Sequence, residues 1–221
     1  MIKKFAVIVF PGSNCDHDAY YIFKKHFNVK VDFVWHQEHN LKDYDAVLIP
    51  GGFSYGDYLR TGAIARFSPI MNEVINDAKK GKPIIGICNG FQILLESGLL
   101  PGALINNKNI KFLSKNVTLN VETNNSIFSN SLNVGEKLTM PIAHKEGNYI
   151  AHNKTINELE QEDRIVFKYY RNNPNGSINN IAGIINKKRN VLGMMPHPER
   201  ACDQYLGSTD GKLIFESILG S

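Results

Sequence analysis

The residue best suited to covalent chemistry is Cys88. It lies in the segment Gly-Ile-Cys-Asn-Gly, residues 86–90, at the end of an apolar run and directly before a helix-like segment. A strand, a tight glycine-flanked turn and a helix in immediate succession are typical of a nucleophile elbow, here with cysteine in place of serine. The helix N-terminus stabilises a thiolate, and the backbone N–H groups after the cysteine can bind an oxyanion. Buried cysteines commonly serve only in packing, but the context of Cys88 is not shared by Cys15 or Cys202, so we expect Cys88 to be the nucleophile.

A thiol nucleophile needs a base, and the chain has seven histidines. His197 is the best placed, because it lies in Pro-His-Pro-Glu, residues 196–199, directly after another apolar run. Glu199 can bind the far imidazole nitrogen and fix the tautomer of His197, as the third member of a catalytic triad does. An ordinary surface turn is the alternative interpretation of this segment. His144, in the segment 141–146, is the rival base.

The order of the predicted elements places these residues in one fold. Apolar runs alternate with helical segments in the first half, which predicts an α/β fold with an open, doubly wound, mostly parallel sheet and helices on both faces. Ligands of such sheets bind beyond the carboxyl ends of the strands. The second half has strand-like runs with little helix between them, which favours some antiparallel pairing. We expect residues 1–221 to form a single domain. The predicted strands are residues 5–10, 29–34, 45–52, 83–87, 116–123, 137–142, 164–169, 181–185 and 191–195; the predicted helices are 16–27, 64–80 and 210–219; and 172–180 is a predicted surface loop.

Composition excludes several classes of protein. No run approaches the ~20 apolar residues that span a bilayer, and the first residues do not resemble a signal peptide, so we expect a cytoplasmic protein. A net charge of +4 with scattered lysines gives little support for nucleic-acid binding. The sequence has no G-x-x-x-x-G-K-[ST] loop for nucleotide phosphates.

The elbow and the Pro-His-Pro-Glu segment together resemble the triad, or class I, glutamine amidotransferases. This resemblance implies a triad of Cys88, His197 and Glu199. Further segments along nearly the whole chain are similar to the glutaminase subunits of phosphoribosylformylglycinamidine synthase. They are Pro-Gly-Ser-Asn-Cys-Asp at 11–16, Gly-Gly-Phe-Ser-Tyr-Gly-Asp-Tyr-Leu-Arg at 51–60, Gly-Ile-Cys-Asn-Gly-Phe-Gln at 86–92, Met-Pro-Ile-Ala-His at 140–144, Asn-Pro-Asn-Gly-Ser at 173–177 and Gly-Met-Met-Pro-His-Pro-Glu-Arg at 193–200.

The resemblance also implies roles for other residues. Cys88 would form a glutamyl thioester, the backbone of Gly52 and Asn89 would form the oxyanion hole, and Gln92 would lie along the bound glutamine. The loop 54–60 would lie near the site. Lys145 departs from the family pattern, in which a small residue or glycine follows the Ala-His pair, and this bears on how the loop meets glutamine or a partner.

The same resemblance implies partners. Ammonia from glutamine would pass to a separate large synthetase subunit, with a small accessory subunit in the same complex, for amidation of formylglycinamide ribonucleotide in purine biosynthesis. No cofactor or metal is expected in this chain, while the synthetase would use ATP and Mg²⁺. Two other functions stay open: an elbow-cysteine peptidase or γ-glutamyl hydrolase without a synthetase, and a non-catalytic regulatory protein with the same fold.

Overall fold

The computed structural model describes residues 2–220 and contains one large sheet, in which one group of adjacent strands is parallel and the other antiparallel. The central strands are apolar and buried along their whole length, because helices cover both of their faces. These parallel strands are β1 (Lys4–Val9), β2 (Lys30–Trp35), β3 (Ala46–Ile49), β4 (Ile84–Ile87) and β11 (Val191–Met194).

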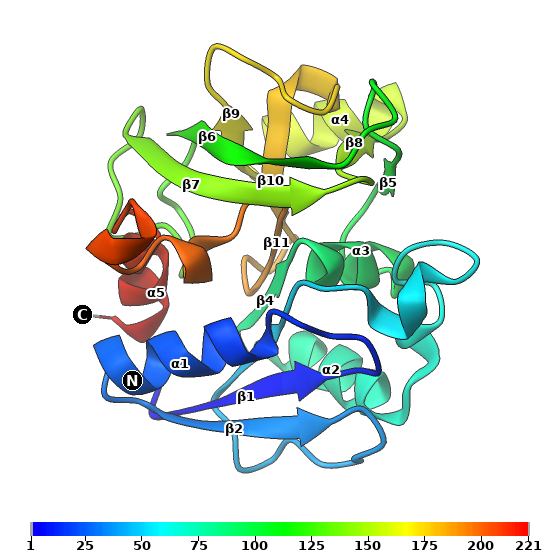
Figure 1. Cartoon of the computed structure of the whole chain (residues 1–221), viewed down its shortest axis with the longest axis vertical. Helices are drawn as coiled ribbons and strands as arrows, with labels where there is room; N and C mark the ends of the chain where they lie inside the picture. Colours follow the sequence, from blue (N-terminus) through cyan, green and yellow to red (C-terminus); the bar gives the residue numbers. More distant parts are fainter. Residues whose placement is uncertain (1, 221) are drawn as a thin grey trace.

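The other half of the sheet is antiparallel. It consists of β10 (Ile181–Ile185), β9 (Ile165–Tyr169), β6 (Leu113–Val121) and β7 (Lys137–His144). Buried and partly exposed residues alternate along β7, as in a sheet with one solvated face. The strand order is β2-β1-β3-β4-β11-β10-β9-β6-β7. In Figure 1, β2 and β1 lie at the bottom, β4 and β11 near the middle, and the antiparallel strands at the top. A separate pair is formed by β5 (Ala103–Ile105) and β8 (Asn148–Ile150).

Helices pack on both faces of the parallel half. They include α1 (Asp16–His26), α2 (Pro69–Lys80), α3 (Asn89–Glu96) and α5 (Lys212–Leu219). Phe23 of α1 stacks on Phe5 of β1 with ring centroids 4.1 Å apart. Gly86 of β4 faces α3, since an added Cβ would lie 2.5 Å from Leu94 Cδ1. The register sets Gly86 level with Ile8, three residues from Phe5, so α1 and α3 lie on opposite faces. The predicted fold class is therefore confirmed.

Three sequence-based expectations need correction. The helix predicted at 64–80 begins only at Pro69, because Ser68 precedes a proline and adopts extended backbone. A helix that the sequence did not indicate, α4 (Asn153–Gln161), separates β8 from β9. The segment 172–180 is irregular, but Asn175 and Ser177 within it are buried, so it is not simply a surface loop.

Within residues 2–220, no helix has both the length and the apolarity to cross a bilayer. The expectation of one domain is not tested by the arrangement of the sheet and stays a prediction.

Candidate active site

Cys88 lies between β4 and α3, at the carboxyl end of a central parallel strand. Its backbone has φ 51° and ψ −104°, a strained conformation for a residue with a side chain. The N–H of Cys88 donates to Met194 O at 2.8 Å, which ties the turn to β11. A Cβ on Gly90 would lie 2.0 Å from Ile49 O, so only glycine lets α3 approach β3 this closely. The strand, turn and helix thus form the strained elbow that the sequence predicts around Cys88.

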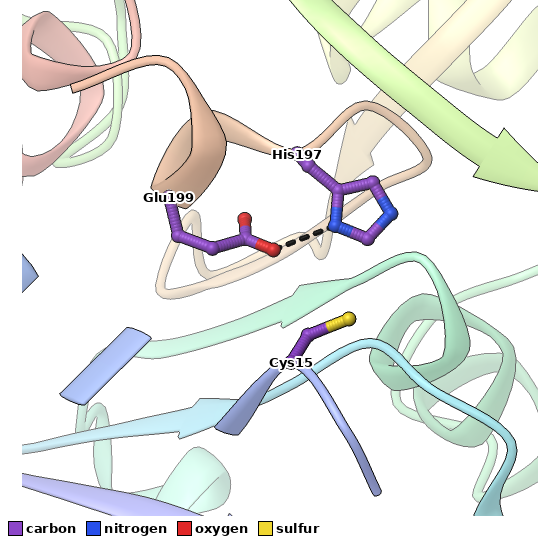
Figure 2. A group of neighbouring side chains, drawn as sticks. All are labelled: Cys15, His197 and Glu199. Carbon is purple, nitrogen blue, oxygen red and sulfur yellow. Dashed lines mark hydrogen bonds and ion pairs between the residues drawn. The ribbon is translucent and has the colours of Figure 1, made fainter. Parts of the chain in front are cut away.

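His197 and Glu199 form a buried pair at the end of β11. His197 Nδ1 and Glu199 Oε1 are 2.6 Å apart, and each side chain is 1% exposed. Figure 2 shows the imidazole and the carboxylate facing each other across the start of the 3₁₀ turn η4 (Pro198–Arg200). Among the described residues, His197 Nε2 and Glu199 Oε2 have no hydrogen-bond partner. The carboxylate therefore holds one imidazole nitrogen and leaves the other for a reacting group.

The pKa of His197 follows from these neighbours. Burial by itself lowers the pKa, but the charge of Glu199 and the thiols of Cys88 and Cys15 outweigh it and raise the pKa of His197 well above its usual value. The buried imidazole is thus prepared to hold a proton taken from a thiol.

Gly51 marks the point where these side chains converge. A Cβ built on Gly51 would lie 2.8 Å from His197 Cε1, 3.1 Å from Cys15 Sγ and 3.4 Å from Cys88 Cβ. The imidazole and both cysteines therefore surround one backbone position that must lack a side chain. The structure brings Cys88 and His197 together although 109 positions separate them in the sequence (197 − 88).

A cavity of about 270 Å³ opens beside the thiol. Gly52, which has φ 133°, lies on this cavity, and oxyanion binding by its backbone stays a prediction. The Cys88 thiol donates to Ala143 O at 3.6 Å, and both residues line the cavity. The lining residues are Gly52, Phe53, Asp57, Thr61, Cys88, Gln92, Ala143, His144, Lys145 and Glu146.

Gln92 and Asn89 are buried on the first turns of α3. Gln92 Nε2 donates to Glu146 O at 2.6 Å and its Oε1 accepts from Asn89 Nδ2 at 3.0 Å. Asn89 Oδ1 in turn accepts from Ser54 N at 3.2 Å. Gln92 is therefore a buried part of the cavity wall and not a solvent-facing helix residue. Oxyanion binding by the backbone of Asn89 stays a prediction.

His144, the rival base, also lies on the cavity. Its Nδ1 is 3.1 Å from Asn107 Oδ1, an amide in place of a carboxylate. Burial first, and then the charge of His197, lowers the pKa of His144 to about 4. The lowered pKa makes His144 a weak proton acceptor, and it has no carboxylate partner to stabilise an imidazolium. The geometry therefore favours His197 as the base.

The end of β7 and the turn that follows it, residues 144–147, are held by the buried Asn107. The Asn107 Nδ2 donates to His144 O at 2.9 Å, its backbone N donates to Lys145 O at 2.8 Å, and its Oδ1 accepts from Gly147 N at 3.1 Å. Asn175 adds a further bond from its Nδ2 to Gly147 O at 2.7 Å. Lys145 itself is exposed. Asn107 carries no local signal in the sequence, because it acts only through a distant turn. Asn175 lies in the segment 173–177 that the resemblance singled out, but its contact with Gly147 could not be read from that segment.

Cys15 is a second thiol that sequence reasoning left without a role. Arg200 Nη2 contacts Cys15 Sγ at 3.1 Å, and Figure 2 shows this sulfur beneath the His197 ring. Ligand-type atoms of Cys15, His197 and Glu199 lie within 4.8 Å of one another, and sulfur and imidazole suit Zn²⁺. The Arg200 guanidinium on the sulfur opposes a cation there. The expectation of no metal stays a prediction.

The comparisons with known proteins come from sequence and from structure. Residues 3–212 match the model of the CobB/CobQ-like glutamine amidotransferase domain. The chain is similar to one in the structure of PurLQS from Thermotoga maritima, with 45% identity, a TM-score of 0.91, and coverage of 100% of this chain and 99% of that chain.

More distant likenesses show the fold alone. A putative GMP synthase subunit from Thermoplasma acidophilum has 18% identity and a TM-score of 0.70, with coverage of 100% of this chain and 94% of that chain. A glutamine amidotransferase from Thermotoga maritima has 18% identity and a TM-score of 0.57, covering 98% and 90%.

Proposed function

Because this chain belongs to the CobB/CobQ-like glutamine amidotransferase family, we propose that it is the glutaminase subunit of a phosphoribosylformylglycinamidine synthase. The amidotransferase family expected from the sequence is confirmed by the match over residues 3–212. The more specific assignment is supported by 45% identity to a chain of PurLQS over essentially the full length of both chains.

The observation that carries the chemistry is the convergence of a strained elbow thiol with a buried imidazole–carboxylate pair. Cys88 Sγ attacks the side-chain amide carbon of glutamine, and the thiol proton moves to His197. Negative charge then develops on the amide oxygen, next to Gly52 and the first N–H groups of α3, where helix N–H groups lack intrahelical partners. His197 returns its proton to the leaving nitrogen, and ammonia departs.

The second half of the reaction restores the thiol. His197 takes a proton from a water molecule, which attacks the glutamyl thioester carbon. The carbon–sulfur bond breaks, glutamate is released, and the proton returns to Cys88. Glu199 holds Nδ1 of His197 throughout, so Nε2 serves the reacting atoms in both halves.

Ammonia release from glutamine tests the chemical part of this proposal. The full chain is expected to convert glutamine to glutamate and ammonia, slowly when it is alone, and Cys88→Ala is expected to abolish the conversion. Cys202→Ala is the matched control, since the Cys202 sulfur contacts Pro198 O, away from the cavity. Cleavage of peptides or γ-glutamyl peptides without glutaminase activity would support the hydrolase alternative instead. A chain that binds partner proteins although its Cys88 is unreactive would support a regulatory role.

The partner is tested by reconstitution. A purified subunit that amidates formylglycinamide ribonucleotide with ATP and Mg²⁺ is expected to accept glutamine in place of free ammonia only when this chain is added. We also expect the isolated chain to be a poor glutaminase, because uncoupled hydrolysis would release ammonia to solvent. Full activity of the free chain would contradict this coupling, and addition of candidate accessory subunits tests whether a third chain is needed.

A further inference from the structure

We infer that Asp57 binds the α-ammonium group of glutamine and selects an α-amino acid for this site. The inference rests on the proposed glutaminase function and adds a specificity-determining residue that the sequence did not indicate. Asp57 lines the same cavity as Cys88, on the loop that follows β3.

The Asp57 carboxylate lacks a partner of its own. Its Oδ1 is buried and has no hydrogen-bond partner among residues 2–220. Burial first, and the charge of Glu146 second, raises the pKa of Asp57 to about 6. Asp57 as a whole is partly exposed, but withdrawal of this one carboxylate oxygen from water without compensation is costly, so an incoming cation with N–H donors gains more there than at the surface.

Two other charged groups, one on the cavity wall and one on the loop of Asp57, are already paired with other residues. Glu146 Oε2 accepts from Thr61 Oγ1 at 2.5 Å, so this carboxylate already has a donor. On the loop of Asp57, the Arg60 guanidinium forms two bonds with Glu96, at 2.7 Å and 2.6 Å.

The remaining titratable groups that line the cavity are on the elbow, at the last residue of β7 and on the turn that follows it. His144 has its pKa lowered to about 4 and is neutral near pH 7, whereas the exposed Lys145 is the one cationic side chain among the lining residues. Cys88 lies on the elbow and is the site of attack. Two carboxylates and a single exposed ammonium leave the cavity with a net preference for a cationic group.

Glutamine fits this preference and the available space. A volume of 270 Å³ holds about nine water molecules at roughly 30 Å³ each, close to the number of non-hydrogen atoms in glutamine. With the side-chain amide at Cys88, the other end of the molecule carries an ammonium that a carboxylate can bind. Simple amides that lack this ammonium would leave Asp57 unpaired.

The backbone of Asp57 permits a clean substitution. Its φ is 55°, in the left-handed region where asparagine and aspartate are enriched among non-glycine residues. Asp57→Asn therefore removes the charge while it keeps both the shape of the side chain and the conformation of the loop.

The test measures the rate at which Cys88 is alkylated, followed by mass spectrometry on the full chain. Three reagents are compared: the diazoketone analogue of L-glutamine, the same diazoketone without its α-amino group, and iodoacetamide. We expect the wild-type chain to react about 10- to 100-fold faster with the amino diazoketone than with the des-amino one at low concentration. In Asp57→Asn this ratio is expected to fall to near one, with an unchanged iodoacetamide rate and an unchanged melting temperature.

The outcomes separate the inference from the proposed function. A wild-type preference that persists in Asp57→Asn overturns the role of Asp57 and leaves glutamine as the substrate. A wild-type chain that reacts with iodoacetamide but with neither diazoketone overturns the glutamine site itself, and the inference with it. Equal rates with both diazoketones in the wild type overturn the inference alone.

Glu146→Gln and a pH series sharpen the test. The amino preference of the wild type is expected to fade as pH drops through about 6, because Asp57 becomes protonated. Removal of the neighbouring carboxylate in Glu146→Gln lowers the pKa of Asp57, so the preference should persist to lower pH. Asp57→Asn should show no such dependence, and a wild-type preference that is flat from pH 5 to pH 8 would contradict the inference.

Discussion

The two walls of the cavity are built in different ways. The elbow wall, which consists of Gly52, Cys88 and Gln92, lies on parallel strand ends and a helix start, and its shape follows from short glycine-containing segments. The turn wall, residues 143–146, consists of the end of the edge strand β7 and the start of the turn after it, and is held by hydrogen bonds from Asn107.

The two walls therefore have different roles in the site. The elbow wall carries the thiol and is fixed by the strained backbone of Cys88 and by its bond to Met194. The turn wall carries no nucleophile, but it supplies the surface opposite the thiol. We therefore expect changes on the elbow wall, and changes to the catalytic base His197 and its partner Glu199, to reduce kcat. Changes behind the turn wall should raise KM for glutamine.

The largest effect is expected for Cys88→Ala. Loss of the nucleophile should lower kcat for glutamine hydrolysis about 10⁵-fold or to the detection limit, as for the nucleophile of other triads. Glutamine binding, measured by calorimetry, should persist because the turn wall and Asp57 are untouched. Loss of binding together with activity would mean that the two walls are not separable.

The second-largest effect is expected for Glu199→Gln, with kcat lowered about 10³- to 10⁴-fold and KM nearly constant. The amide leaves Nδ1 of His197 without a negative partner, so the pKa of His197 should fall. NMR titration of the His197 ring checks this directly. Retention of the high pKa in Glu199→Gln would show that the thiols, and not the carboxylate, set it.

The interaction between His197 and Glu199 should also affect the stability of the fold. The pKa of His197 is higher in the folded chain than in the unfolded one, so its contribution to folding is complete below pH ~6.5 and is lost as pH rises through the folded value. Denaturant unfolding of the wild type and of Glu199→Gln should therefore differ more at pH 6 than at high alkaline pH. A difference that grows with pH would contradict this assignment.

Asn107→Ala tests the turn wall. Removal of the amide leaves His144 O and Gly147 N without their partner and should cost about 1–3 kcal/mol of unfolding free energy. Displacement of the turn should raise KM for glutamine about tenfold, with a smaller change in kcat. Asn106→Ala, at the exposed neighbouring asparagine, is the matched control and should change neither quantity. A fall in kcat alone would place the turn wall in the chemical step.

Cys15→Ser should give the smallest effect. Serine keeps a small polar group beside Arg200, so kcat should change less than about threefold, with a modest shift of the His197 pKa in the pH profile. A loss comparable to that of Cys88→Ala would require a direct role for Cys15 in the chemistry.

The parts of the fold that follow from local pattern were predictable. Continuous apolar runs identified the buried parallel strands, and the glycines around Cys88 identified the elbow. The helix at 64–80 was too long because the effect of Pro69 on Ser68 outweighs the apolar period before it. Helix α4 is short and mostly polar, and the structure buries only Ile156 and Leu159 within it, so the sequence pattern was weak.

The sequence by itself determined the strained elbow at Cys88 and the proximity of His197 to Glu199, because these residues are neighbours along the chain and short-range sterics fix their geometry. Only the tertiary structure decided that His144 faces the amide of Asn107 and not a carboxylate, that Cys15 lies under the imidazole, and that the Oδ1 atom of Asp57 is buried without a hydrogen-bond partner among the described residues. The bond between Thr61 and Glu146, 85 positions apart, is of this second kind. The physical reason is that the charge and solvation of a buried group depend on every element packed against it, and those elements come from distant parts of the chain.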